Sequence, residues 1–249
     1  MDMTGNTILI TGGGSGIGRA LAEALHARGN KVIISGRRAS ALEEVAAANP
    51  GIATATLDVA DADDIARFAR DIVTAHPALD VVIHNAGIMQ AEHLAAPGSD
   101  LAIGEATIAT NLLGPLRLNA ALLPHLLARP RAAIATVSSG LAFVPLTTTP
   151  TYCATKAAIH SWTQSLRHQL KGTNVEVIEI APPAVATDLM PGHAENPNSM
   201  PLADYIAETM AQLEAGAAEN LTERVKFLRF AEARGDYGKV FAALNDGTH

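Results

Sequence analysis

Cysteine is almost absent from this sequence of 249 residues, in which Cys153 is the only one. A single cysteine cannot form a disulfide within the chain, which excludes the small secreted scaffolds that depend on several such bonds. Apolar residues reach 48% of the chain. A chain of this length and composition supports one large core without a disulfide or a structural metal. The composition therefore predicts a globular protein of the reducing cytoplasm.

Positive charge is also scarce, because 18 Lys and Arg face 25 Asp and Glu, a net charge of −7 with histidine neutral. Binding to nucleic acids or anionic membranes depends on clustered Lys and Arg, and the sequence has no such run. The N-terminal residues lack the positive segment of a signal peptide. The longest uncharged run, residues 132–155, contains six Thr and two Pro, so it predicts a strand and a polar site rather than a membrane span. We expect no nucleic-acid partner, no membrane association and a cytoplasmic location.

Short apolar runs alternate with segments of helical periodicity along the chain. This pattern is typical of α/β proteins in which crossover helices join parallel strands. The fold class is therefore α/β, a Rossmann-like doubly wound parallel sheet of about seven strands with helices on both faces. Strands are expected at residues 7–10, 31–35, 52–57, 81–84, 132–138 and 175–180, with a seventh near 221–225.

No linker or repeat divides the chain, so residues 1–249 are expected to form a single domain. Residues 188–200 contain helix-breaking prolines and lack apolar periodicity. We expect a substrate lid over about residues 188–213, in which a mobile segment precedes a helix from 202 to 213.

A glycine-rich segment directly follows the first expected strand and opens into a helix. The segment runs Thr11-Gly12-Gly13-Gly14-Ser15-Gly16-Ile17-Gly18 and so contains five glycines. Glycine lets the backbone approach a ligand closely, and a helix N-terminus offers free N–H groups to a pyrophosphate. The position predicts a dinucleotide-binding loop, and a plain glycine-rich turn is the alternative.

Two arginines stand where the second strand ends, at Arg37 and Arg38, a place where enzymes that use NAD normally carry an acidic residue. Guanidinium groups bind phosphate oxygens bidentately, which favours a cofactor with a 2′-phosphate. The alternative is that both arginines are the solvated start of the next helix. Asp58, followed by Val59 after the third strand, either accepts a hydrogen bond from the adenine or caps the following helix.

Tyr152 and Lys156 are four residues apart in a segment of good helix formers, so both side chains lie on one helical face. A phenol with a pKa near 10 is a poor base at neutral pH, and a nearby ammonium group favours its ionised form. Such a pair is common in proteins, so its functional significance depends on the other motifs in the sequence.

Together these features resemble the short-chain dehydrogenase/reductase family, in its simple single-domain form and its bacterial DltE-like subgroup. The matching positions include Asn85-Ala86-Gly87 after the fourth strand, Asn111, and Ser139 lying 13 residues before Tyr152. They also include Pro182 with Thr187 five residues later. Two positions depart from the family pattern, because His84 replaces an Asn and Pro183 replaces a Gly.

The resemblance implies that Tyr152 is the general acid or base and that Lys156 binds the nicotinamide ribose and lowers the tyrosine pKa. Ser139 would position the substrate oxygen, and Asn111 would hold a water that connects Lys156 to solvent. The implied cofactor is NADP(H), with NAD(H) as the alternative. The implied cofactor-binding residues are Gly12, Ser15, Gly16, Ile17, Gly18, Arg37, Arg38, Asp58, Val59, Asn85, Ala86, Gly87, Tyr152, Lys156, Pro182 and Thr187. A homodimer or homotetramer is also implied. So is a single NAD(P)-binding domain over residues 1–249, in which residues 1–100 form mainly the cofactor half and residues 101–249 the catalytic half.

The expected reaction interconverts a carbonyl and a secondary alcohol on a small, apolar substrate. The substrate wall is expected to comprise Leu141, Phe143, Val144 and Pro145, with Met190 and Met200 from the lid. No His or Cys pair has the spacing of metal ligands, so no metal is expected, and a lone histidine at a strand end such as His84 is expected to be structural. The alternative function is a dinucleotide-binding sensor or scaffold that performs no chemistry.

Overall fold

Seven strands form one sheet in the order β3-β2-β1-β4-β5-β6-β7, and every neighbouring pair is parallel. The computed structural model describes residues 1–96, 101–190, 192 and 194–246. The strands are β1 (Thr7–Thr11), β2 (Lys31–Gly36), β3 (Ala53–Thr56), β4 (Val81–His84), β5 (Ala132–Val137), β6 (Val175–Ala181) and β7 (Glu219–Leu221). The expected doubly wound parallel sheet is thus confirmed.

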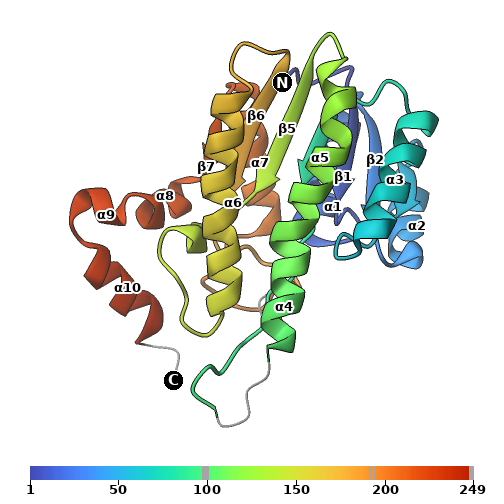
Figure 1. The fold of residues 1–249 in the computed structure, drawn as a ribbon. Helices are drawn as coiled ribbons and strands as arrows, with labels where there is room; N and C mark the ends of the chain where they lie inside the picture. The colour runs from blue at the N-terminus through green and yellow to red at the C-terminus, as the bar shows by residue number, and fades with distance from the viewer. Residues whose placement is uncertain (97–100, 191, 193, 247–249) are drawn as a thin grey trace.

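Helices cover both faces of this sheet, with α1, α2 and α7 on one face and α3, α5 and α6 on the other (Figure 1). Their bounds, with those of the remaining helices, are α1 (Gly16–Ala27), α2 (Ala39–Ala48), α3 (Ala62–Ala75), α4 (Ala102–Ile108), α5 (Gly114–Leu127), α6 (Pro150–Gln169), α7 (Leu202–Glu214), α8 (Glu223–Arg229), α9 (Ala231–Arg234) and α10 (Tyr237–Asn245). A π-helical turn, Ala109–Leu113, joins α4 to α5. A 3₁₀ turn, Gly140–Ala142, follows β5.

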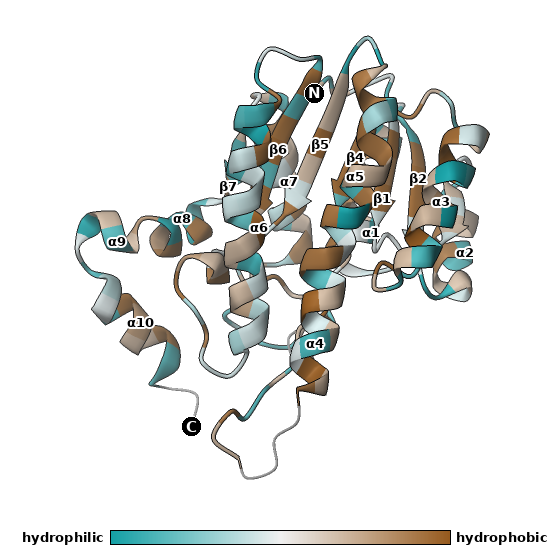
Figure 2. Ribbon diagram, in the orientation of Figure 1, coloured by the Kyte–Doolittle hydropathy of each residue, from teal (hydrophilic) through white to brown (hydrophobic). Residues whose placement is uncertain are grey.

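Strand β1 shows why the sheet is buried on both faces. Successive side chains of a strand point to opposite faces, and all five residues of β1 are buried. Ile8 and Ile10 pack with residues of α1 and α7, whereas Leu9 packs with residues of α3 and α5. In Figure 2 the central strands are accordingly mostly brown, while the helices around them carry teal on part of their surface. A strand that is buried on both faces has a continuous run of apolar residues, and β1 has such a run from Ile8 to Ile10.

The carboxyl ends of the parallel strands all lie at the same edge of the sheet. The glycine-rich segment follows β1, residues 85–87 follow β4, Ser138 and Ser139 follow β5, and Pro182 follows β6. The strand order reverses between β1 and β4, and ligands of such folds bind in the crevice beside this reversal. The fold therefore gathers the sequence motifs around one crevice.

Two expected elements differ in the structure. Strand β7 ends at Leu221, because Thr222 is already the N-cap of α8, so the expected strand at 221–225 is mostly helix. Helix α7, expected as part of a lid, lies in the core, where Tyr205 and Leu213 are buried on the α1 face of the sheet. Only the segment before α7 remains a candidate lid, and its residues 191 and 193 lie outside the described residues.

The C-terminal helices α8, α9 and α10 extend beyond the β7 edge of the sheet (Figure 1). Ala231 and Val240 from these helices pack against the buried Val144. Within the described part of the chain, every helix lacks either the length or the apolar character needed to cross a bilayer.

Candidate active site

A cleft of about 1120 Å³ opens at the carboxyl edge of the sheet. Residues from every sequence motif line it. They include Gly12, Ser15, Gly16, Ile17, Gly18, Arg37, Arg38, Asp58, Val59, Asn85, Ala86, Gly87, Ser139, Tyr152, Lys156, Pro182 and Thr187. Pockets for small molecules usually measure about 300–1,000 Å³, so this cleft has room for a long ligand together with a second, smaller one.

The glycine-rich loop passes too close to its neighbours for larger residues. A Cβ at Gly18 would lie 2.3 Å from the carbonyl oxygen of Gly12, and one at Gly13 would lie 2.5 Å from Ile34. Gly12 and Gly16 have φ of 69° and 53°, a backbone conformation that favours glycine. Ser15 is the N-cap of α1, and its side chain makes no capping bond. The first turn of α1 also has no acidic residue, so its N-terminus is suited to an anion.

Gly18→Ala is therefore expected to lower the free energy of unfolding by about 1–3 kcal/mol through overpacking, and to weaken dinucleotide binding. Chemical denaturation and a fluorescence titration with NADPH would measure the two effects. Gly238→Ala is the matched control, because a Cβ there meets nothing within 4 Å. Equal stability and affinity in both variants would contradict the tight-loop interpretation.

Arg37 and Arg38 lie at the mouth of the cleft, directly after β2. Both are exposed, and neither guanidinium has an ion-pair partner among the residues that the structure describes. Their side chains are thus free to receive an anionic group at this end of the cleft.

Asp58 lines the same end of the cleft, and its carboxylate accepts a hydrogen bond from the amide of Ala60 at 2.9 Å. The N-cap of α3 is Asp61, whose side chain accepts from the amides of Asp63 and Asp64. The alternative role of Asp58 as a helix cap is therefore wrong.

The segment after β4 is held against the glycine-rich loop. The amides of Asn85 and Ala86 both donate to Oγ1 of Thr11 at 3.0 Å. The side-chain amide of Asn85 donates to the carbonyl oxygens of Thr11 and Gly12. These bonds fix the floor of the cleft at the point where the strand order reverses.

Tyr152, Lys156 and Ser139 meet above this floor. Tyr152 and Lys156 come from one face of α6, and Nζ of Lys156 lies 5.5 Å from the centre of the Tyr152 ring. The same ammonium group donates to the carbonyl oxygen of Val137 at 2.7 Å. Ser139 follows β5, and its hydroxyl lies close enough to the Tyr152 hydroxyl to favour the ionised form of the phenol. An acid, a cation and a second hydroxyl therefore converge in the cleft.

Burial dominates the electrostatics of this group. Burial raises the pKa of Tyr152 to about 12, although the Ser139 hydroxyl acts in the opposite direction. Burial also lowers the pKa of Lys156 to about 8. Without a further positive charge nearby, Tyr152 is protonated at neutral pH and is able to donate a proton rather than accept one.

Asn111 lies beside the cleft rather than on its surface, in the π-helical turn between α4 and α5. Its amide nitrogen donates to the carbonyl oxygen of Ile88 at 2.9 Å, and its oxygen accepts from the amide of Ile88 at 2.8 Å. It also donates to Thr155 of α6. Asn111 thus ties the segment after β4 to the helix that carries Tyr152 and Lys156.

Similarity to known proteins agrees with this geometry. A family model described as short chain dehydrogenase matches residues 6–198. The chain belongs to the short-chain dehydrogenases. The oxidoreductase DltE of Bacillus subtilis (strain 168) is 41% identical to this short-chain dehydrogenase over 249 residues, which cover 98% of each chain.

Two solved structures share the fold of this short-chain dehydrogenase. A short chain dehydrogenase from Burkholderia cenocepacia J2315, solved in complex with NADP, has a TM-score of 0.82 at 24% identity and covers 98% of this chain and 99% of its own. A short chain dehydrogenase/reductase from Burkholderia phymatum, solved in complex with NAD, has a TM-score of 0.81 at 20% identity and covers 96% of each chain. The expected enzyme class, an NAD(P)-dependent dehydrogenase or reductase of this family, is confirmed by the family model and by the similarity to DltE.

The substrate end of this short-chain dehydrogenase differs in part from expectation. Leu141 lines the cleft as expected. Met190, expected in the same wall, packs with Leu141 in the Tyr152 cluster and is not among the residues that line the cleft. Phe143 lies elsewhere, edge-on to the His160 ring at a centroid distance of 4.8 Å. Val144 is fully buried under α9 and α10. The expectation that Phe143 and Val144 form the substrate wall is therefore wrong, because the 3₁₀ turn after Ser139 directs them away from the cleft.

Pro145 and Met200, expected in the same wall, also do not line the cleft. Met200 is buried in the core, where its backbone forms an isolated parallel β-bridge with Val185. Its amide donates to the carbonyl of Ala184, and its carbonyl accepts from the amide of Ala186. These bonds bring together the two ends of the segment between β6 and α7.

Sequence reasoning missed several residues that line the cleft. They are Met89, Leu146, Leu189, Leu228 and Leu244, which are all apolar. Leu228 comes from α8 and Leu244 from α10, so elements far along the chain complete the cleft. Their sequence shows only ordinary helical periodicity, which does not indicate that one face meets a ligand site.

His84 is buried at the end of β4, and burial lowers its pKa to about 4. In the unfolded chain this histidine protonates near pH 6.5, so between pH 6.5 and 4 the unfolded state binds more protons than the folded state. With respect to His84, the folded protein is therefore most stable above pH 6.5. Its free energy of unfolding falls as the pH drops from 6.5 toward 4, because only the unfolded state gains the proton over this range.

His84→Asn is expected to remove this loss, so that the fall in unfolding free energy from pH 7 to pH 4.5 becomes smaller by about 2–3 kcal/mol. Urea denaturation at the two pH values measures it. The exposed His93 provides the control variant His93→Asn, which should behave as the wild type. An unchanged pH dependence in His84→Asn would show that His84 is not the responsible group.

Proposed function

We propose that this short-chain dehydrogenase prefers NADP(H) and interconverts a carbonyl and a secondary alcohol on a small, apolar substrate. The proposal rests on one observation: Ser139, Tyr152 and Lys156 lie together in the same cleft that the glycine-rich loop lines. A protein that only senses a dinucleotide has no need for a protonated phenol beside a buried ammonium group.

The cleft fits a dinucleotide along its length. The loop from Gly12 to Gly18 would hold the pyrophosphate, because a Cβ at Gly18 would overlap the neighbouring backbone and the α1 N-terminus faces this end. Arg37 and Arg38 would hold a 2′-phosphate, and Asp58 would contact the adenine. The cofactor, when bound, supplies or accepts the hydride. The fold accommodates either nicotinamide dinucleotide, so the preference rests on the two arginines.

In the direction of reduction, Tyr152 gives its hydroxyl proton to the oxygen of the substrate carbonyl. Ser139 donates a second hydrogen bond to that oxygen and holds it at a fixed distance from the phenol. Lys156 keeps a positive charge beside the developing phenolate. Asn111 fixes α6 against the segment after β4. Pro182 and Thr187 line the cleft and would hold the carboxamide of the cofactor.

An apolar substrate is proposed because the far end of the cleft carries few charges. Among the residues that line the cleft, the charged ones are Arg37, Arg38, Asp58, Lys156 and Asp188. Only Asp188 belongs to the segment between β6 and α7, which we propose to act as the lid. Hydrogen bonds of Met200 with Ala184 and Ala186 join the two ends of this segment beside the cleft.

The test is a panel of aliphatic and aromatic ketones and aldehydes, assayed by the loss of NADPH absorbance with the purified protein. Turnover of apolar members, with little turnover of carboxylated ones, is the expected result. Tight NADPH binding with no turnover of any member would instead favour the sensor or scaffold.

A further inference from the structure

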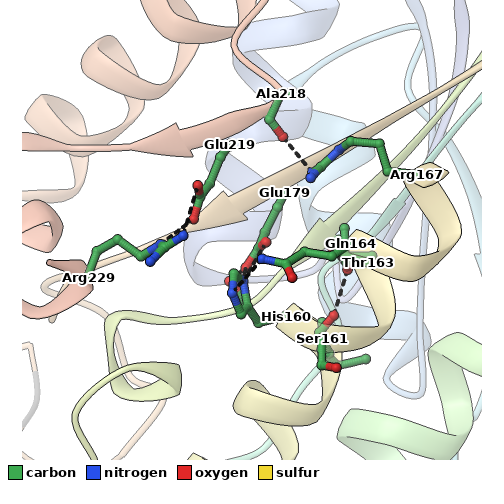
Figure 3. A network of polar contacts seen from close by, with 12 residues as sticks. His160, Ser161, Thr163, Gln164, Arg167, Glu179, Ala218, Glu219 and Arg229 are labelled. Carbon is green, nitrogen blue, oxygen red and sulfur yellow. Dashed lines mark hydrogen bonds and ion pairs between the residues drawn. The ribbon is translucent and has the colours of Figure 1, made fainter. Parts of the chain in front are cut away.

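A polar network lies behind the catalytic group, centred on Glu179 in β6. Its side chain is fully buried, which is costly for a carboxylate unless it is paired and hydrogen-bonded. Oγ of Ser138 donates to it at 2.5 Å, and Nδ1 of His160 lies 2.9 and 2.8 Å from its two oxygens. Figure 3 shows His160 on α6 and Glu179 on β6 pointing toward one another. The carboxylate of Glu179 therefore links the end of β5 to helix α6.

Those two elements are the ones that carry the catalytic residues. Ser138 directly precedes Ser139, and its amide forms the hydrogen bond to Ile180 at the end of the β5–β6 pairing. His160 follows Lys156 by four residues on α6, which is about 6 Å along the helix. The position of Ser139 relative to Tyr152 depends on how β5 and α6 sit against each other.

We propose that Glu179, His160 and Ser138 act as positioning residues, which hold Ser139 at the distance from Tyr152 and Lys156 that the reaction requires. This inference rests on the proposed function, since it assigns a role within the same site. The bond from Lys156 to Val137 is one link between α6 and β5. The Glu179 network supplies a second link one helical turn away, and the buried hydrogen bond between Thr136 of β5 and Thr163 of α6 supplies a third. The Glu179 link is the one that reaches Ser138, directly beside Ser139.

The surroundings of the network support this role. Nε2 of Gln164 lies 3.0 Å from Nε2 of His160, so the ring accepts there and carries its proton on Nδ1, toward Glu179. Phe143 packs edge-on to His160, and the Arg229 guanidinium lies 4.8 Å from the Phe143 ring centre. These contacts hold the imidazole in one orientation.

The same cluster has the composition of a metal site, since ligand atoms of His160, Glu179 and Glu219 lie within 4.8 Å of one another. Glu219 is the β7 neighbour of Glu179 in the sheet register. However, Arg229 pairs with Glu219 at 2.6 Å and supplies the positive charge there (Figure 3). Both carboxylate oxygens of Glu179 already have hydrogen-bond partners in Ser138 and His160, so the geometry favours a hydrogen-bond network over a metal site.

The first test measures turnover in Ser138→Ala, Glu179→Leu and Glu179→Gln. Kcat is expected to fall on the order of 10–100-fold in the first two variants, with the KM for NADPH unchanged, because a small displacement of a positioned group is costly. Glu179→Gln keeps an acceptor for Ser138 and is expected to recover part of the loss. Glu219→Gln is the matched control, since it alters the neighbouring carboxylate, and it should retain kcat.

A double-mutant cycle separates positioning from general loss of structure. When Ser139 is already replaced by Ala, the additional change Glu179→Leu should lower kcat by less than about threefold. The reason is that Glu179 acts by positioning the Ser139 hydroxyl, which this variant lacks. Additive losses would overturn the proposal. So would a loss of activity on removal of metal by EDTA that zinc restores, which would make the cluster a metal site.

A second measurement does not depend on turnover. The amide of Leu141 donates to Oγ of Ser139 at 3.1 Å, so its hydrogen exchange reports whether Ser139 is held in place. Exchange of the 138–142 amides should be at least about tenfold faster in Ser138→Ala and Glu179→Leu than in the wild type and in Glu219→Gln. Equal exchange rates in all four proteins would refute the positioning role even if no substrate were found. Failure of the proposed function would appear separately, as turnover that does not depend on Tyr152.

Discussion

Tyr152→Phe is expected to lower kcat for carbonyl reduction by about 100- to 10,000-fold, the usual contribution of a positioned general acid. The substitution removes one hydroxyl from a buried ring and keeps its packing against Met89 and Cys153. Affinity for NADPH should stay within about twofold, because the lost proton donor acts on the substrate and not on the phosphates. Steady-state assays and a fluorescence titration on the same preparations measure both quantities.

Tyr237→Phe is the matched control for this prediction, because Tyr237 is 38% exposed and lies on α10. It should retain wild-type turnover. If Tyr152→Phe also retained near-wild-type turnover, Tyr152 would not be the proton donor, and another acid of the cleft would have to take its place. The pKa of Tyr152, which burial raises to about 12, makes this expectation specific to reduction. Oxidation of the alcohol requires the phenolate and therefore a further positive charge in the cleft.

The features that could be predicted from the sequence are those whose geometry is set locally. A glycine-rich segment between a strand and a helix fixes its own backbone, and a spacing of four residues places Tyr152 and Lys156 on one helical face. Parallel strands then bring the motifs at their carboxyl ends to one edge. These steps need only the period of each element and the topology rule for doubly wound sheets.

The substrate wall could not be predicted in the same way. Phe143 and Val144 follow Ser139 closely, but the 3₁₀ turn at Gly140–Ala142 rotates the chain, so that both side chains point toward other helices. Leu228 and Leu244 reach the cleft from the C-terminal helices, and their direction depends on tertiary packing. Side-chain direction after an irregular turn carries no sequence signal of its own.

The Glu179 network left a signal that sequence reasoning could have used. Strand β6 contains two glutamates, of which Glu176 near its start is exposed and Glu179 lies among buried apolar residues. A carboxylate in a strand buried on both faces needs partners. His160 is one turn beyond Lys156 on the helix that packs over this strand. The pairing of the two, however, depends on the register of α6 on β6, and that register is not encoded in either segment alone.

The double substitution of Arg37 and Arg38 by Ala is expected to raise the Kd for NADPH by about 10- to 100-fold and to leave the Kd for NADH nearly unchanged. Each charge-assisted bond to a phosphate contributes about 1.5–3 kcal/mol when well formed, and exposure to solvent reduces this contribution. Because both side chains are exposed, the difference between the cofactors should shrink as salt is added. Titrations of both cofactors at low and high ionic strength measure it.

The control is Arg70→Ala, which removes one exposed positive charge on α3 and should leave both affinities unchanged. If the double variant bound NADPH and NADH more weakly by the same factor, the arginines would act only through the overall electrostatic potential of the cleft. They would then not contact the 2′-phosphate. The stronger test is Arg37→Asp, which places a carboxylate where NAD-dependent folds hold the ribose hydroxyls. If the end of β2 selects the cofactor, this one change should reverse the preference, because the carboxylate repels the 2′-phosphate and accepts hydrogen bonds from the ribose.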